Sequence, residues 1–209
     1  MTIVVRDAVR WLFAIVATHQ YIVLFGVVAI EEAGVPLPAP TDLVIAFYGY
    51  RVRDDPVTLA LVVLVCALAS ATGTLVPFSL ARRFGPPVAH RFARWIDIDP
   101  VQVDVWTDRI ARNGFRAVLI GRLIPGARVA MSVIAGTAQV RPMTFSSAVF
   151  VAALIYWSIW VAIGVIFGPA VRRIIGPAYI EYVFIVLPVL FISLFLFRYL
   201  RARRRMRAV

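Results

Sequence analysis

The fold of this chain is decided by residues 117–140, AVLIGRLIPGARVAMSVIAGTAQV. An apolar arm leads to a Pro125-Gly126 break flanked by Arg122 and Arg128, and a second apolar arm rich in small residues follows. Proline and glycine interrupt a helix, the former because it lacks a backbone donor. Irregular backbone at membrane depth persists only where protein or water covers it. In a membrane protein this segment therefore predicts a re-entrant helical hairpin that faces an internal cavity.

Composition places the segment in a membrane. Of the 209 residues, 62% are hydrophobic and 16% charged, and the mean hydropathy is +0.88. Soluble domains are about 45–50% apolar and about 25% charged, and a domain of this size cannot bury such a surplus. The chain is predicted to be an all-α polytopic integral membrane protein. Disordered, collagen-like and disulfide-rich secreted classes are excluded.

Other apolar segments differ in whether they can cross a bilayer, which takes about 20 residues. The segments predicted to span it are residues 11–30, 57–81, 143–168 and 179–197. Residues 31–50, EEAGVPLPAPTDLVIAFYGY, instead begin with two carboxylates and carry three prolines at alternate positions. They cannot form one regular helix and predict a second re-entrant hairpin.

The arginines orient these segments. All 22 basic residues are arginine, and six of them lie in the last twelve residues. Because basic loops remain cytoplasmic, we expect segment 82–116, the tail 198–209 and both termini on that side. The two hairpins then enter from opposite faces, as in transporters built from inverted repeats. We expect one membrane domain, residues 1–197, with halves 11–81 and 117–197 that each hold a hairpin.

The segment between the halves is predicted to contain an amphipathic helix. Residues 100–112 place Val103, Trp106 and Ile110 on one face and arginines on the other, ending at Asn113-Gly114. Such a helix lies along the inner leaflet, although a surface for a protein partner would show the same pattern. The net charge of +11 is interpreted as attraction to anionic lipid, not nucleic acid, because its largest cluster directly follows an apolar run.

Four charged side chains fall within the predicted membrane thickness: Glu31, Asp42, Arg122 and Arg128. Each would cost about 2.5–3.5 kcal/mol facing lipid, so they must pair, face water or hold a charged ligand. Guanidinium groups bind phosphate oxygens bidentately, and the helix start after Pro125 and Gly126 offers free backbone donors. Arg122, Arg128, Pro125 and Gly126 therefore predict a site for a lipid phosphate headgroup whose tail remains in the bilayer.

Carboxylates on the opposing hairpin would neutralise these arginines while the site is empty. We expect Glu31, assisted by Asp42, to exchange protons as the lipid binds and leaves. Glu32 is ambiguous, because adjacent helical positions point about 100° apart and one of the two glutamates can face the surface. A purely structural salt-bridge cluster, or hairpins too shallow to reach the membrane interior, would explain the same charges.

The two hairpin segments resemble the signature segments of the DedA family of bacterial membrane proteins, also called the SNARE-associated or VTT-domain superfamily. The likeness rests on residues 31–38, EEAGVPLP, followed by Asp42, and on residues 121–128, GRLIPGAR. It covers about residues 20–170. One departure is Pro40, where many members have an acidic residue, so the assignment of Asp42 as the second carboxylate follows the family pattern less closely than that of Glu31.

The resemblance implies a lipid transporter of the bacterial cytoplasmic membrane. Members are associated with proton-dependent return of undecaprenyl phosphate, the carrier lipid of cell-wall synthesis, and eukaryotic relatives scramble phospholipids. The family's acidic pair would map to Glu31 and Asp42 and its arginine pair to Arg122 and Arg128. Expected partners are an anionic polyprenyl phosphate and protons, without nucleic acid, and a homo-oligomer is left open. A phospholipid scramblase and a non-transporting scaffold for membrane homeostasis are the alternatives.

A lipid phosphatase would also gather arginines around a phosphate, but it would need a nucleophile or a general acid. The two histidines, His19 and His90, adjoin neither signature, and Cys66 lies alone in an apolar run. The sequence has no metal-ligand spacing. We therefore expect no enzyme, no metal and no cofactor.

Overall fold

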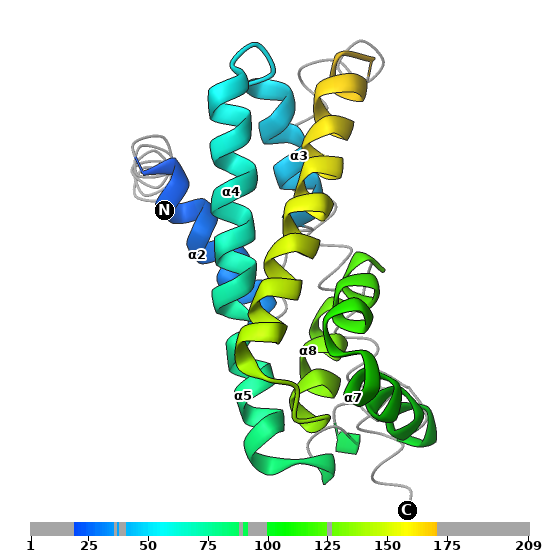
Figure 1. The fold of residues 1–209 in the computed structure, drawn as a ribbon. Coiled ribbons are helices and arrows are strands. Elements are labelled where there is room, and N and C mark those ends of the chain that lie inside the picture. The colour runs from blue at the N-terminus through cyan, green and yellow to red at the C-terminus, as the bar shows by residue number, and fades with distance from the viewer. Residues whose placement is uncertain are drawn as a thin grey trace, which may run out of the picture. The chain divides into compact units, whose positions relative to one another are not determined.

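The computed structural model describes residues 19–35, 37, 41–87, 90–91, 100–124 and 127–170 (Figure 1). All regular structure in these ranges is helical, as the sequence predicts, and none of it is strand. The predicted span 179–197, the basic tail 198–209 and the first eight residues of the predicted span 11–30 lie outside them.

Two described helices are long and apolar enough to cross a membrane, and they coincide with the predicted spans 57–81 and 143–168. The first, Pro56–Phe84, consists of α4 (Pro56–Gly73) continuing into α5 (Leu75–Phe84), as Figure 1 shows. The second is Pro142–Ala170. Each has 29 residues, more than the 20 that a span requires.

Both predicted hairpin segments are interrupted where their prolines lie. Helix α2 (Gln20–Glu32) ends in a turn at Gly34, whose φ of 94° favours glycine, and α3 begins at Thr41. Helix α7 (Pro100–Leu123) is likewise separated from α8 (Arg128–Thr137). Neither segment is one continuous helix. Their re-entrant course through the bilayer and the layout of four spans remain predictions.

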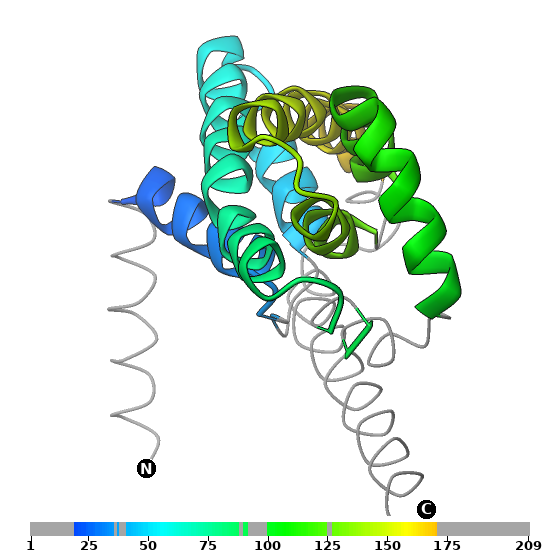
Figure 2. The ribbon, with the colours of Figure 1, turned by 60° about the horizontal axis from the view of Figure 1, so that its bottom comes forward.

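The chain divides into two compact units, the first comprising residues 1–35 and 60–158 and the second residues 36–59 and 159–209. In the first unit α8 packs against both α5 and α7, and Figures 1 and 2 show it between them. The second unit contains α3 (Thr41–Arg51) and the end of helix Pro142–Ala170.

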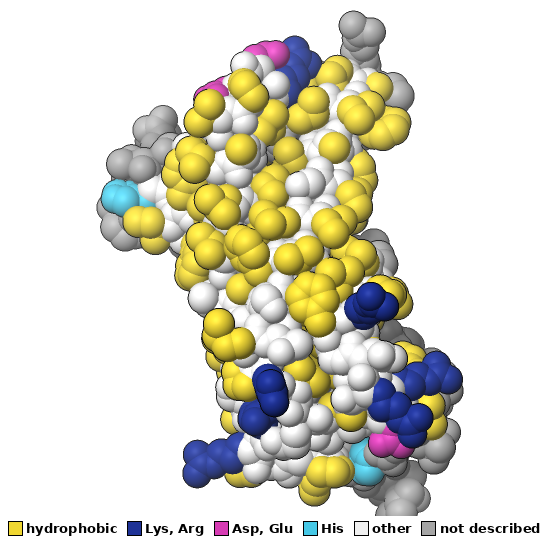
Figure 3. Space-filling view, in the orientation of Figure 1, with side chains coloured by type: hydrophobic (Ala, Val, Ile, Leu, Met, Phe, Trp, Pro, Cys, Tyr) yellow, Lys and Arg dark blue, Asp and Glu magenta, His cyan; other side chains and the backbone are white. Residues whose placement is uncertain are grey.

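Apolar side chains line the outward faces of the two long helices. On α4, Leu61, Leu64 and Leu68 are 42%, 41% and 44% exposed, and their spacing of three and four residues forms one stripe. Val151 and Ile155 are similarly exposed on the second helix, and Figure 3 shows such side chains over both helices. A core helix of a soluble protein would bury these residues, so the stripes indicate faces that contact lipid.

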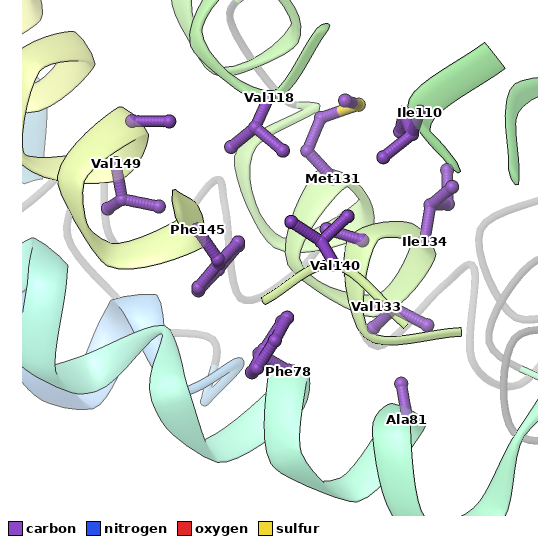
Figure 4. Close-up of a cluster of buried hydrophobic side chains, with 12 residues drawn as sticks. Phe78, Ala81, Ile110, Val118, Met131, Val133, Ile134, Val140, Phe145 and Val149 are labelled. Atoms are coloured by element: carbon purple, nitrogen blue, oxygen red, sulfur yellow. The ribbon is translucent and has the colours of Figure 1, made fainter. Parts of the chain in front are cut away.

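The core of the first unit is a cluster of buried side chains at the level of α5 and α8 (Figure 4). Phe78 of α5 stacks on Phe145 with ring centroids 4.1 Å apart and an interplanar angle of 12°. Met131 and Ile134 of α8 complete the cluster from the other side, together with Val118 of α7. This packing fixes the start of α8 relative to the end of α7.

Helix α7 departs in two ways from the predicted amphipathic helix 100–112. It bends at Asn113, whose φ of −125° and ψ of 31° are not helical, but then continues to Leu123. Ile110 is only 3% exposed and belongs to the core cluster, against which Trp106 also packs. Part of the apolar face of this helix therefore packs against the protein, and its course along the inner leaflet stays a prediction. The side chain of Val103 lies outside the described part.

Close helix contacts in both units depend on glycine. In the first, a Cβ at Gly73 would lie 2.8 Å from Cα of Ala29, so α2 and α4 touch through their backbones. In the second, a Cβ at Gly49 of α3 would lie 2.9 Å from the carbonyl oxygen of Val161. Real Cβ atoms do not approach this closely, and these positions accept only glycine without movement of the helices.

Candidate functional site

Two arginines and two glutamates meet in the first unit, where the ends of three helices converge. Glu31 and Glu32 occupy the last turn of α2, Arg122 the last turn of α7 and Arg128 the first position of α8. Acidic groups at a helix C-terminus and a basic group at an N-terminus oppose the helix dipole. Glu31, Glu32 and Arg128 all stand at such unfavourable ends, so the charges are stabilised by one another and not by their own helices.

Arg122 is the most deeply buried cation of this cluster, with a side chain 2% exposed. Its Nη2 donates to Oε2 of Glu32 at 2.7 Å. Its Nη1 donates to the backbone carbonyl of Arg128 at 3.0 Å and to Oγ of Ser132 at 3.1 Å. One guanidinium thus ties the ends of α2 and α7 to the first turn of α8.

Arg128 is held by longer contacts and is more exposed, at 13%. Its Nη1 lies 3.3 Å from Oε1 of Glu32, and its Nη2 lies 3.4 Å from Oε1 of Glu31. Its Cζ also lies over two aromatic rings, 4.7 Å from the centroid of Tyr156 and 5.2 Å from that of Trp157. The two arginines are therefore not equivalent. Arg122 is buried and links three helices through short hydrogen bonds, whereas Arg128 is more exposed and has longer ion pairs.

Glu32 receives donors from three helices, and a fourth helix reaches it indirectly through Ser70. Besides the two arginines, Oγ of Ser70 on α4 donates to its Oε1 at 3.3 Å, and Nε1 of Trp157 donates to that hydroxyl at 3.0 Å. The Glu32 side chain is 2% exposed, whereas that of Glu31 is 27% exposed. A carboxylate in this position satisfies both guanidinium groups at once, as a phosphate oxygen pair would.

The space between these side chains is filled by the side chains themselves. It is lined by Glu32, both arginines, Ser70 and the helix Pro142–Ala170, and it has no room for a water-sized sphere. An anion can lie between the two arginines only if the Glu32 carboxylate moves away, because that carboxylate pairs with both of them. The arrangement can hold one charged group at a time between the arginines.

The structure brings together four of the predicted site residues, namely Glu31, Glu32, Arg122 and Arg128. Asp42 lies in the first turn of α3, in the second unit. Pro125 and Gly126 lie outside the described residues. Glu32, which the sequence left ambiguous, pairs with both guanidinium groups, and Glu31 pairs with that of Arg128.

Sequence reasoning missed the uncharged members of the site: Ser70, Ser132, Tyr156 and Trp157. A serine in the apolar run 57–81 was a signal, since a buried hydroxyl needs a partner. So was the Tyr156-Trp157 pair in the middle of a predicted span, because such residues gather at membrane interfaces and their polar atoms need partners when buried. Among the described residues, no three His, Cys, Asp or Glu side chains gather as metal ligands would.

Two long apolar helices and a buried arginine–glutamate cluster at the ends of shorter helices define a helical membrane protein with charged groups in its interior. The VTT domain model matches residues 38–166, and the chain belongs to this family, the DedA family.

Individual relatives agree with this assignment. The chain is 31% identical over 129 residues to YkoX, an uncharacterised membrane protein of Bacillus subtilis strain 168, a match covering 62% of this chain and 58% of YkoX. It is 24% identical over 205 residues to undecaprenyl phosphate transporter A of Staphylococcus aureus strain NCTC 8325 / PS 47, covering 92% of this chain and 96% of that protein. The same-named Bacillus subtilis protein is 25% identical over 62% of this chain and 65% of its own length. No solved structure matches the chain.

Proposed function

We propose that this protein transports a lipid phosphate of the polyprenyl phosphate class, such as undecaprenyl phosphate, across the cytoplasmic membrane of a bacterium. The observation that carries the proposal is the convergence of Arg122, Arg128 and Ser70 on the buried carboxylate of Glu32. Two guanidinium groups and a hydroxyl are the donors that a phosphate headgroup needs. The first N–H groups of α8, which have no partner within the helix, add a positive helix end.

In this proposal the two arginines have different tasks. Arg122 keeps the ends of α7 and α8 together through the carbonyl of Arg128 and the hydroxyl of Ser132. Arg128, with its longer contacts and greater exposure, is the group that turns from glutamate to phosphate. The prenyl tail stays in lipid, beside the exposed apolar stripes.

Proton coupling follows from the competition between carboxylate and phosphate. An ionised Glu32 or Glu31 occupies the guanidinium groups that the lipid needs, and protonation removes that competition. Lipid binding then accompanies proton uptake, and deprotonation returns the carboxylates to the arginines and releases the lipid. We assign the leading role to Glu32, with Glu31 beside it. A tenfold change in occupancy requires only about 1.4 kcal/mol of coupling.

Membership of the family and the likeness to two proteins named undecaprenyl phosphate transporter A support the choice of lipid. Both identities are near 25%. The phosphate headgroup is supported by the arginines of the site, whereas the prenyl chain is supported by these relatives alone.

Purified protein in liposomes tests the proposal. A fluorescent polyprenyl phosphate is placed in both leaflets, and a reductant that cannot cross the membrane measures how fast the inner lipid reaches the outer face. We expect translocation faster than in protein-free liposomes and dependent on a pH gradient, with Arg128→Gln slow. Arg141→Gln, which alters an exposed arginine outside the cluster, is the matched control.

Other outcomes identify the alternatives. Translocation of many phospholipids without dependence on the gradient would indicate a scramblase. A folded protein without translocation would indicate a scaffold in which the ion pairs only lock the helices. Release of inorganic phosphate from the lipid would indicate a phosphatase.

A further inference from the structure

The aromatic pair beside Arg128 has a geometry that a core contact does not require. The rings of Tyr156 and Trp157 are perpendicular, with centroids 5.3 Å apart and an interplanar angle of 86°. The Cζ of Arg128 lies within cation–π distance of both, at 4.7 and 5.2 Å. Both rings are buried, Tyr156 at 6% and Trp157 at 0% exposure. Arg128 therefore rests in a corner formed by two rings of one helix.

The contact of Arg128 with the two rings becomes important when its ion pairs with the carboxylates are broken. The attraction of Arg128 to Glu31 and Glu32 disappears when those groups are protonated or displaced. The attraction of a guanidinium to the faces of Tyr156 and Trp157 does not depend on that protonation. It is also stronger where water is excluded, as it is here. The two rings can thus keep Arg128 in place while its ion pairs exchange.

We propose that Tyr156 and Trp157 are positioning residues of the lipid phosphate site, an aromatic seat that holds Arg128 ready for the phosphate while the glutamates are released. The inference rests on the proposed function and extends it to two residues outside both signature segments. Without the seat, a long arginine side chain would have to be ordered anew each time the lipid binds, at a cost in conformational entropy.

Trp157 has a second contact that must be separated from this role. Its Nε1 donates to Ser70, which donates to Glu32, so a change at Trp157 can also act through the carboxylate. Trp157→Phe removes the N–H and keeps a ring, whereas Trp157→Leu removes both. Tyr156→Phe keeps the ring and removes the hydroxyl, whereas Tyr156→Leu removes both. The comparison of these variants distinguishes the seat from the hydrogen-bond chain.

The test is titration of the purified proteins in detergent with farnesyl phosphate, a short polyprenyl phosphate, at pH 7. We expect Tyr156→Leu and Trp157→Leu each to raise the apparent dissociation constant about tenfold, which corresponds to about 1.4 kcal/mol and is within the range of desolvated cation–π contacts. Trp157→Phe should recover most of the loss. Phe167→Leu, which removes an exposed ring ten residues further along the same helix, is the control.

Two results would refute the proposal that the two rings position Arg128. Leucine variants that bind like the wild type would show that the rings do not hold Arg128 for the phosphate. Trp157→Phe as damaging as Trp157→Leu, with Tyr156→Leu harmless, would place the effect in the chain through Ser70. If one leucine variant does not fold, the other carries the test, because each ring contributes separately. Failure of the wild type itself to bind would instead refute the proposed function, and the seat with it.

Discussion

Replacing Arg122 with lysine keeps the charge and removes the geometry, and it tests whether the two arginines differ as the structure indicates. The guanidinium of Arg122 donates to three acceptors on three residues: Glu32, the carbonyl of Arg128, and Ser132. A lysine ammonium is a point charge on a flexible stem and cannot reach all three from one position. We expect it to keep the contact with Glu32 and to leave the other two acceptors without their donor.

The magnitude follows from those two lost bonds. A hydrogen bond to a charged group contributes about 1.5–3 kcal/mol, so Arg122→Lys should destabilise the protein by roughly 3 kcal/mol. For a chain of about 200 residues this lowers the melting temperature by about 6–12 °C. Arg128→Lys should cost less, because the ion pairs of Arg128 are longer, at 3.3 and 3.4 Å, and a lysine ammonium keeps the charge that faces the glutamates.

The assay is thermal unfolding of the purified variants in one detergent, followed by intrinsic tryptophan fluorescence, with the exposed Arg141→Lys as control. The reasoning predicts a large drop for Arg122→Lys, a small one for Arg128→Lys and none for the control. It also predicts that both cluster variants transport lipid poorly. Equal melting temperatures for Arg122→Lys and the wild type, or equal drops for the two cluster variants, would refute the conclusion that Arg122 links the helices more strongly than Arg128 does.

Two further predictions concern the scaffold around the site. Gly73→Ala should destabilise the protein by about 1–3 kcal/mol in the same thermal assay, because its Cβ would meet the backbone of Ala29. Gly26→Ala is the control and should not destabilise the protein, because its Cβ would have open space. Equal effects of the two substitutions would refute the close contact between α2 and α4. The pKa of Asp55 is lowered, chiefly because the Thr58 hydroxyl donates to its carboxylate, so it stabilises the first turn of α4 above its ordinary pKa and loses this effect as the pH falls through the lowered value. The protection of amides in that turn, measured against their exchange rate in an unstructured peptide at the same pH, should therefore fall below about pH 4 in the wild type and show no such change in Asp55→Asn, whereas identical pH profiles would contradict the assignment.

The breaks in the chain could be predicted because proline acts locally. Prolines at 36, 38 and 40 and at 125 forbid a regular helix whatever surrounds them, and the structure ends α2 and α7 before them. The pairing of glutamates with arginines also followed from the cost of charge in lipid. Both conclusions need only the residues themselves.

Which glutamate pairs with both arginines could not be predicted, because it depends on how α2 is rotated about its axis. Glu31 and Glu32 differ by about 100° in direction, and the contact of Gly73 with Ala29 fixes which one faces the arginines. The amphipathic pattern around Ile110 was ambiguous for a similar reason. An apolar face predicts burial, but it does not distinguish burial against the protein from burial against lipid. Tyr156 and Trp157 carry no formal charge, and nothing local in the sequence connects them with Arg128.

The central claim is that Glu32 stands where the lipid phosphate binds, and the most direct test is the affinity of Glu32→Gln for farnesyl phosphate. Titrations of wild type, Glu32→Gln and Arg128→Gln are compared in one detergent at pH 7. The account predicts that Glu32→Gln binds at least as tightly as the wild type, because the competing charge is gone, and that Arg128→Gln binds at least about tenfold more weakly. Loss of binding in folded Glu32→Gln as large as in Arg128→Gln would contradict it, since the glutamate would then support the site and not compete for it.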